Sequence, residues 1–273
     1  MEKRAFVTAA AVAAAVGVFV GAWFIVRGIL DRRTGTFRTL PETVETAAAP
    51  ETSPPTVPPA DTPVPRRPYV PERLASALER FGFGITDLGS EQILLVESDG
   101  NEARIWAYGI DANGNYRPVL GGEEGISGWT GEMGVSPEKS EGDRRTPAGV
   151  FRIGFAFGNG EDPGTGLSYR EVTPYSLWVD DPASRWYNQW VEEDEISEPD
   201  WSTAERLSEY GDSYRYAVAV EYNTDPAVPG AGSAIFLHCG SQPTAGCVAV
   251  STGDMEGILL WLDEDASPVI VIE

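Results

Sequence analysis

Prolines are concentrated in one stretch of the chain, and this limits which part can fold into a globular domain. Ten of the 21 prolines lie between Pro41 and Pro71, among threonine, alanine and glutamate. Such a stretch has too little apolar surface to bury, and proline favours an extended path. We therefore predict a linker over residues 34–70, either a stalk or a spacer of no set length. One folded domain is predicted over residues 71–273, with its core at residues 88–273.

An uncharged segment precedes the linker. Ala5 to Val26 is a run of 22 residues without a charged side chain. As a helix this run would span ~33 Å, which is enough for the hydrocarbon core of a bilayer. It is long for a cleaved signal peptide, and no convincing cleavage motif follows it. We predict a transmembrane helix within a membrane anchor over residues 1–33, with a cleaved signal peptide as the alternative.

The charge of the chain excludes one class of partner. The sequence holds 42 acidic and 20 basic residues, for a formal net charge of −22. A negative field of this size repels phosphate backbones, so nucleic acid is not expected as a partner. The two cysteines are too few for a disulfide-stapled fold, whereas eight tryptophans and ten phenylalanines can fill a sizeable core.

Short apolar segments punctuated by glycine and proline predict a mainly β domain with a few helices. One helix is predicted between Pro71 and Gly82, and another after Ser251, where Ser251 and Asp254 form a variant of the capping box. The predicted strands are 92–98, 104–111, 149–157, 217–222, 234–238 and 269–272.

A histidine and a cysteine lie close together in the sequence, in a setting that suits nucleophilic chemistry. His238 is the single histidine of the chain; it ends a predicted strand, and a polar loop leads from it to Cys247. Folding that loop back could place the thiol beside the imidazole. A thiolate is the reactive form of cysteine, and an imidazole can take up its proton. Gly246 permits a tight turn, so its backbone N–H could face a developing oxyanion.

The spacing of these residues is also compatible with roles that involve no catalysis. Cys247 could be a buried apolar residue, which is a common role of a free cysteine. It could form a disulfide with Cys239, although alternation along a strand would point His238 and Cys239 to opposite faces. A metal site of His238, Cys239 and Cys247 matches no familiar zinc spacing.

Five further blocks of the sequence follow one another in chain order. They are 139–151 (KSEGDRRTPAGVF), 178–184 (WVDDPAS) with 187–188 (YN), 201–205 (WSTAE), 229–238 (PGAGSAIFLH) and 243–249 (PTAGCVA). Together these blocks resemble the L,D-transpeptidase catalytic domain family, the YkuD-type domain. The resemblance spans about residues 90–273 and implies a single β-sandwich domain. It also implies that Cys247 is the nucleophile, that His238 is the general base and acid, and that the Gly246 backbone donates to the oxyanion.

The resemblance implies a function as well. Cys247 would attack a peptidoglycan stem peptide and form an acyl-enzyme, from which a neighbouring stem would accept the acyl group as a 3→3 cross-link. Water as the acceptor would make the same site an L,D-carboxypeptidase. The substrate lies outside the membrane, so we expect a single-pass protein of the cell membrane with an extracytoplasmic catalytic domain. We expect a monomer without a metal or an organic cofactor.

The loop departs from the best-known family pattern, Ser/Thr-His-Gly-Cys-x-Arg. Ala245 stands in place of the histidine and Ala249 in place of the arginine. This leaves open a wall-binding module that does not turn over substrate. The candidates for substrate binding are Thr244, Tyr187, Arg185 and Lys139, and Arg144 and Arg145 are further candidate cations. For the charged residues, surface solvation is the alternative.

Two further patterns have a functional and a structural interpretation. The acidic residues of 192–200 could bind a cation, although such a run is more often a solvated loop. Trp178, Trp186 and Trp190 could line a groove for glycan or peptide, and the core is the alternative for at least two of them.

Overall fold

The computed structural model describes residues 67–273, and the predicted anchor and most of the predicted linker lie outside this range. The elements, in chain order, are α1 (Glu72–Arg80), α2 (Ile85–Leu88), β1 (Gln92–Asp99), β2 (Glu102–Ile110), β3 (Tyr116–Leu120), β4 (Ile126–Trp129), β5 (Val135–Ser136), β6 (Thr146–Pro147), β7 (Gly149–Gly158), β8 (Tyr169–Glu171), β9 (Ser176–Val179), β10 (Gln189–Glu192), η1 (Glu193–Glu195), β11 (Ala204–Arg206), η2 (Leu207–Tyr214), β12 (Ala217–Val220), β13 (Phe236–Cys239), β14 (Val248–Val250), α3 (Thr252–Trp261), η3 (Glu264–Ala266) and β15 (Val269–Ile272).

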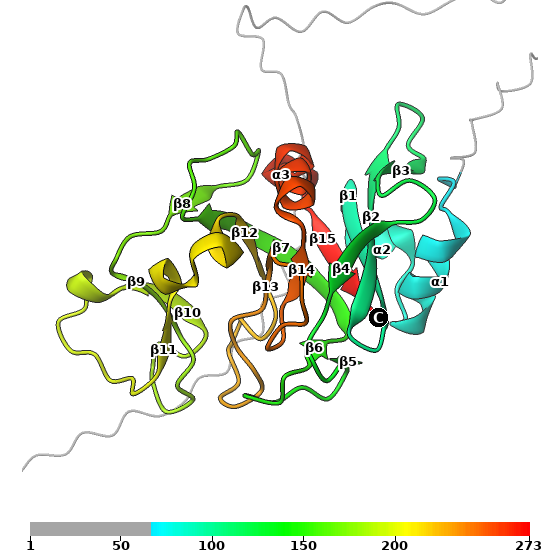
Figure 1. The fold of residues 1–273 in the computed structure, drawn as a ribbon. Helices are drawn as coiled ribbons and strands as arrows, with labels where there is room; N and C mark the ends of the chain where they lie inside the picture. Colours follow the sequence, from blue (N-terminus) through cyan, green and yellow to red (C-terminus); the bar gives the residue numbers. More distant parts are fainter. Residues whose placement is uncertain (1–66) are drawn as a thin grey trace, which may run out of the picture. The chain divides into compact units, whose positions relative to one another are not determined.

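A ten-stranded sheet forms the centre of the domain (Figure 1). Its strands follow the order β1-β15-β7-β12-β13-β14-β4-β2-β3, and β8 pairs with β7. An additional pairing of β1 with β2 closes this path on itself. We predicted a β-sandwich, and the structure refines this: the main sheet curls into a closed path, and a smaller three-stranded sheet packs on its outer face. A closed path leaves few exposed strand edges.

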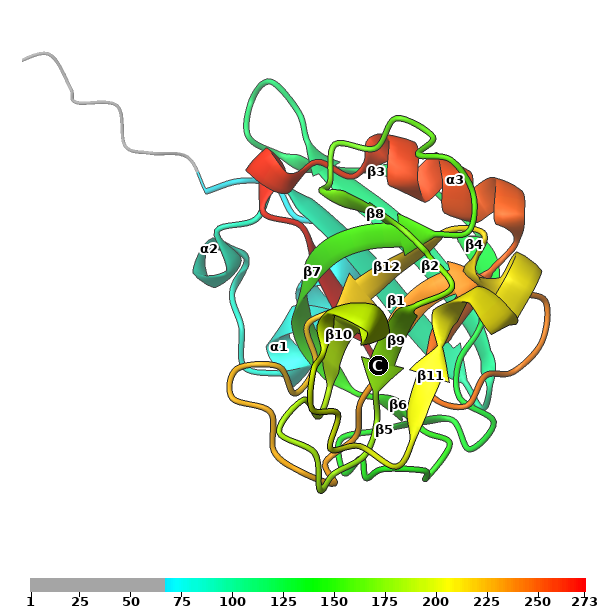
Figure 2. The same cartoon turned by 90° about the vertical axis from the view of Figure 1, so that its left-hand side faces the viewer.

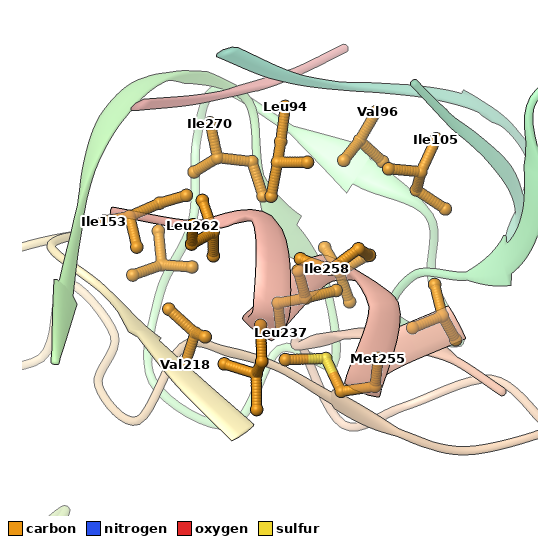
Figure 3. Close-up of a cluster of buried hydrophobic side chains, with 14 of the residues drawn as sticks. Leu94, Val96, Ile105, Ile153, Val218, Leu237, Met255, Ile258, Leu262 and Ile270 are labelled. Atoms are coloured by element: carbon orange, nitrogen blue, oxygen red, sulfur yellow. The ribbon is translucent and has the colours of Figure 1, made fainter. Parts of the chain in front are cut away.

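Alternating residues of the sheet fill the interior of this closed path. On β1, Leu94 and Val96 belong to the largest core cluster, and on β13 Leu237 belongs to it as well. Helix α3 contributes Met255 and Ile258, both fully buried. Figure 3 shows these side chains meeting around α3. Because side chains alternate between the two faces of a strand, the intervening residues must be covered from outside.

Two layers cover the outer face of the sheet. Helix α1 packs Leu74 and Leu78 against the outward residues of β1 and β15, such as Ile93 and Val271. The three-stranded sheet β10-β9-β11 lies on the other side, over β7, β12 and β13 (Figures 1 and 2). Where these layers cover the sheet, the outward residues are therefore as apolar as the inward ones. Residues 93–96 of β1 and all of β15 are continuous apolar runs.

The predicted elements agree well with the structure. All six predicted strands and both predicted helices are present, and the closing strand has the predicted bounds, Val269–Ile272. Ser251 is the N-cap of α3, and its side chain accepts a hydrogen bond from the Asp254 backbone N–H at 3.2 Å.

Contact with the domain begins before the predicted boundary at residue 71. Tyr69 exchanges hydrogen bonds with the Asn115–Tyr116 segment, and both measure 2.9 Å. No helix of residues 67–273 is long and apolar enough to cross a membrane. The membrane anchor of residues 1–33 remains a prediction.

Candidate active site

The pairing of β13 with β14 brings His238 and Cys247 to one face of the sheet. The two strands are parallel, and His238 pairs with Ala249. Cys247 directly precedes β14, and its side chain lies in the same outer cluster as that of Phe236. His238 follows Phe236 by two residues, so alternation turns both to the same face. The structure thus confirms that the loop folds back and brings the thiol and the imidazole to one region.

Cys239 lies on the opposite face. Its side chain belongs to the core cluster inside the main sheet, and its sulfur contacts the Tyr216 carbonyl oxygen at 3.5 Å. Both cysteines are free thiols. The alternation argument against a Cys239–Cys247 disulfide is therefore confirmed.

One cavity contains both candidate catalytic side chains. Its volume is about 610 Å³, and His238 and Cys247 both line it. Glu205 from β11 and Tyr210 and Tyr214 from η2 form part of its wall. This volume is within the range of cavities that bind small ligands and peptide side chains. No group of His, Cys, Asp and Glu within residues 67–273 is arranged to hold a metal ion.

The Cys247 sulfur forms its hydrogen bonds with the backbone. It donates to the Ala234 carbonyl oxygen at 3.2 Å and accepts from the Phe236 N–H at 3.3 Å. Burial raises the pKa of the thiol to about 12, and the nearby Glu205 carboxylate adds to this increase. Within residues 67–273, no hydrogen bond joins the sulfur to His238. Thiolate formation therefore requires a change at the site, such as substrate entry or a rotation of the thiol.

The imidazole of His238 is held by backbone and aromatic contacts. Its Nδ1 lies 2.8 Å from the Cys239 carbonyl oxygen. A carbonyl only accepts, so this contact places a proton on Nδ1. The Tyr214 ring packs edge-on against the imidazole, with 5.4 Å between the centroids. Burial lowers the pKa of His238, and hydrogen bonds to the Cys239 and Ser213 backbone oppose that shift. A neutral imidazole is the form that can accept a proton.

Two threonines fix the turn that leads into Cys247. The Thr244 and Thr146 hydroxyls donate to the Cys247 carbonyl oxygen at 2.7 and 3.0 Å. Thr244 also accepts a hydrogen bond from the Gly246 N–H at 3.1 Å. The Gly246 N–H, which we predicted as an oxyanion donor, is therefore occupied in this structure. The Cys247 N–H donates no hydrogen bond within residues 67–273, and it is the donor left for an oxyanion.

Gly246 is required at this turn for steric reasons. Its φ angle is +152°, and a Cβ atom there would lie 3.1 Å from the Arg145 carbonyl oxygen. A larger residue would therefore be strained by its backbone conformation and crowded by its neighbours.

Of the four predicted substrate-binding residues, Thr244 alone lines the cavity. Tyr187 is 3% exposed, and its hydroxyl donates to Glu141 at 2.5 Å and accepts from the Gly232 N–H at 3.1 Å. Arg185 is exposed and donates to the Glu198 carbonyl oxygen at 2.8 Å. Lys139 is buried and paired with Asp143. The sequence revealed the polar character of the other three side chains but not their direction, and their role in substrate binding stays a prediction.

The acidic run and the tryptophans have structural roles. Glu192 accepts hydrogen bonds from Thr173 and Ser176, each at 2.8 Å, so its carboxylate is engaged within the fold. Trp178 and Trp190 pack in the outer cluster with Phe236 and Cys247. Trp186 packs in a separate small cluster. None of the three tryptophans lines the cavity.

Sequence reasoning missed the part of the cavity wall that Glu205, Tyr210 and Tyr214 form. Glu205 accepts a hydrogen bond from the Tyr214 hydroxyl at 2.8 Å, and burial raises the pKa of this carboxyl group to about 7. Both residues line the same cavity as the thiol, and the Glu205 carboxylate adds to the rise in the pKa of Cys247. Glu205 lies within one of the sequence blocks, WSTAE, and its position there was the available signal.

The fold and the site define a mainly β domain in which the Cys247 thiol and the His238 imidazole line a shared cavity. The family model of the YkuD L,D-transpeptidase catalytic domain matches residues 85–271. The chain belongs to this family, as the resemblance of its sequence blocks predicted.

Similarity to individual proteins is limited. No curated protein sequence matches the chain. Among solved structures, the chain is similar to the helical cell shape determining protein Pgp2 (K307A mutant) from Campylobacter jejuni. The identity is 17% and the TM-score 0.35, over 72% of this chain and 53% of that chain. The chain thus spans about half the length of that protein.

Proposed function

We propose that the protein is a cysteine-dependent L,D-transpeptidase that acts on peptidoglycan stem peptides. The observation that carries this proposal is the shared cavity, which is lined by the Cys247 thiol and the His238 imidazole from one face of the sheet. Membership of the family supports the substrate class. The uncharged run Ala5–Val26 supports a location at the outer face of a membrane, where this substrate is found.

The reaction would proceed in two acyl-transfer steps. The imidazole of His238 takes the thiol proton, and the Cys247 sulfur attacks the carbonyl carbon of the third stem residue. The bond to the terminal D-alanine breaks, and the imidazolium returns the proton to the leaving amine. An amine of a neighbouring stem then attacks the thioester and gives a proton to the imidazole. The C–S bond breaks, and the thiolate that leaves takes this proton back as the thiol. The Cys247 N–H would stabilise the oxyanion, and one such donor contributes roughly 3–4 kcal/mol.

A single experiment tests the proposal. The full-length protein, purified in detergent, is incubated with a tetrapeptide stem, and released D-alanine is measured. The wild-type protein should release D-alanine, and Cys247→Ala should reduce release to the uncatalysed background. Cys239→Ala is the matched control, because it removes the same group from the opposite face and should retain release. Equal release by Cys247→Ala and the wild type would refute the proposal.

The acceptor is decided in the same reaction mixture. Cross-linked dimers in the product indicate a transpeptidase, and shortened tripeptides without dimers indicate an L,D-carboxypeptidase. Mass spectrometry of the products separates the two.

One observation favours a second candidate, a wall-binding module without turnover. The hydrogen bonds of the Cys247 sulfur go to the backbone rather than to His238. A module of this kind would bind muropeptides without acylation of its thiol. Intact-protein mass spectrometry after exposure to a carbapenem separates the candidates, because an adduct on Cys247 excludes an idle site.

A further inference from the structure

Lys139 carries a buried positive charge directly behind the turn that ends in Cys247. Its side chain is 4% exposed, and its ammonium group donates to Asp143 Oδ1 at 2.9 Å. A Cβ atom built on Gly246 would lie 3.3 Å from the Lys139 Nζ atom. The ammonium group therefore lies against the residue that precedes the candidate nucleophile. Lysine is almost never fully buried unless it is paired, so this placement calls for an explanation.

The fold fixes the position of this ammonium group. A Cβ atom on Gly232 would lie 2.9 Å from the Lys139 Cε atom, so the glycine leaves room for the side-chain stem. The segment of Lys139 is anchored next to it, because the Glu141 N–H donates to the Gly230 carbonyl oxygen at 2.9 Å. The Glu141 carboxylate in turn accepts from the Ser233 hydroxyl at 2.8 Å. Lys139 is thus held between the 230–233 segment and the Gly246 turn.

The charge of Lys139 acts on the Cys247 thiol from outside the cavity. Glu205 approaches the thiol from β11, Tyr210 and Tyr214 from η2, and His238 from β13. Lys139 does not line the cavity and approaches from behind the turn. Burial and Glu205 raise the pKa of Cys247, and the ammonium group of Lys139 opposes both. A buried charge is screened little by solvent, so it can act on a neighbouring group without direct contact.

We propose that Lys139 is a positioning residue whose buried ammonium group stabilises the negative charge on the Cys247 sulfur when the thiol is deprotonated. The S–H bond breaks, the proton passes to the imidazole of His238, and the electron pair remains on the sulfur beside the ammonium group. Lys139 does not contact the substrate in this role. The inference deepens the proposed function, and it rests on that function only in treating Cys247 as the nucleophile.

The experiment measures alkylation of Cys247 by iodoacetamide between pH 6 and 10 in the full-length protein. Peptide mass spectrometry follows Cys247 and Cys239 separately. An opposite charge at close range shifts a pKa by about one to three pH units, and the thiolate is the reacting form. Lys139→Met should therefore slow Cys247 alkylation at least about tenfold at each pH below the thiol pKa.

Two control variants separate charge from shape. Lys139→Arg keeps the positive charge and should restore most of the wild-type rate. Arg144→Met removes a nearby but exposed cation, which is paired with Glu132, and should leave the rate unchanged.

Loss of the fold is recognised through Cys239. This thiol lies in the main core and is 2% exposed, so its alkylation reports opening of the domain. If Lys139→Met exposes Cys239, the double variant Lys139→Met/Asp143→Asn replaces it, because removing both charges leaves no unpaired buried carboxylate. The slow rate should persist in the double variant.

The proposal is overturned if a variant without the lysine reacts at Cys247 at the wild-type rate while Cys239 stays protected. It is also overturned if Lys139→Arg is as slow as Lys139→Met. No peptidoglycan is present in this measurement. A failure to release D-alanine would thus refute the proposed function and leave this inference intact, and the reverse also holds.

Discussion

Replacement of Glu205 by glutamine should change how the stability of the protein depends on pH. Glu205 lines the cavity, and its carboxylate accepts a hydrogen bond from the Tyr214 hydroxyl at 2.8 Å. Glutamine has the same shape and keeps an oxygen that can accept this bond. The substitution therefore removes a titrating proton and little else.

The magnitude follows from the pKa of Glu205. Burial raises this pKa from an ordinary value of 4.5 to about 7. Between these pH values the unfolded chain ionises Glu205 while the folded chain keeps the proton, so wild-type stability falls as pH rises. A difference of one pKa unit corresponds to about 1.4 kcal/mol. The loss therefore amounts to about 3 kcal/mol and is complete above pH 7.

The variant escapes this loss because glutamine does not titrate. The difference in free energy of unfolding between Glu205→Gln and the wild type should be near zero at pH 4. It should reach about 3 kcal/mol in favour of the variant at pH 8. Titration of every other group, including His238, occurs in both proteins and cancels in the difference.

Urea unfolding followed by tryptophan fluorescence at pH 4, 6 and 8 provides the measurement. Glu209→Gln is the matched control, because that side chain is 74% exposed and its difference should stay flat with pH. A flat difference for Glu205→Gln as well would show that the carboxyl group is ionised in the folded protein and would refute the reasoning.

Two further substitutions test the turn and the core. Gly246→Ala should lower the free energy of unfolding by about 1–3 kcal/mol, because its φ is +152° and the new methyl group would lie 3.1 Å from the Arg145 carbonyl oxygen. Gly257→Ala is at an open position in α3 and should instead raise the free energy of unfolding by about 0.5–1 kcal/mol. Thermal unfolding of both distinguishes them, and a loss in both would contradict the steric argument. Ile258→Ala should cost about 2–5 kcal/mol, because this side chain is fully buried in the core; a midpoint in urea equal to that of the wild type would contradict its assignment to the core.

The sequence was most informative where local patterns determine the structure. The run Val269–Ile272 has the apolar character of a strand covered on both faces, and β15 has these bounds. Alternation also predicted that His238 and Cys239 point to opposite faces, which follows from strand geometry alone. These properties depend on neighbouring residues, so a single sequence contains them.

The sequence was least informative where distant segments meet. Strand β11 is three residues long, and its Glu205 reaches the cavity because β11 pairs with β9 and η2 returns Tyr214 to the sheet. Lys139 and Tyr187 are polar and stand in recognisable blocks, but their burial depends on the 230–233 segment. Nothing in the local sequence indicates which side of a loop becomes the interior.

The closing of the main sheet has a consequence for synthesis. Strand β1, near the start of the domain, pairs in parallel with β15, which ends one residue before the last residue of the chain. Pairings between such distant segments form slowly, because a long loop must be ordered first. The sheet cannot become complete until β15 has left the ribosome tunnel, since β15 lies between β1 and β7. The central fold of a nascent chain therefore stays unfinished until the residues from β1 to β15 have all emerged.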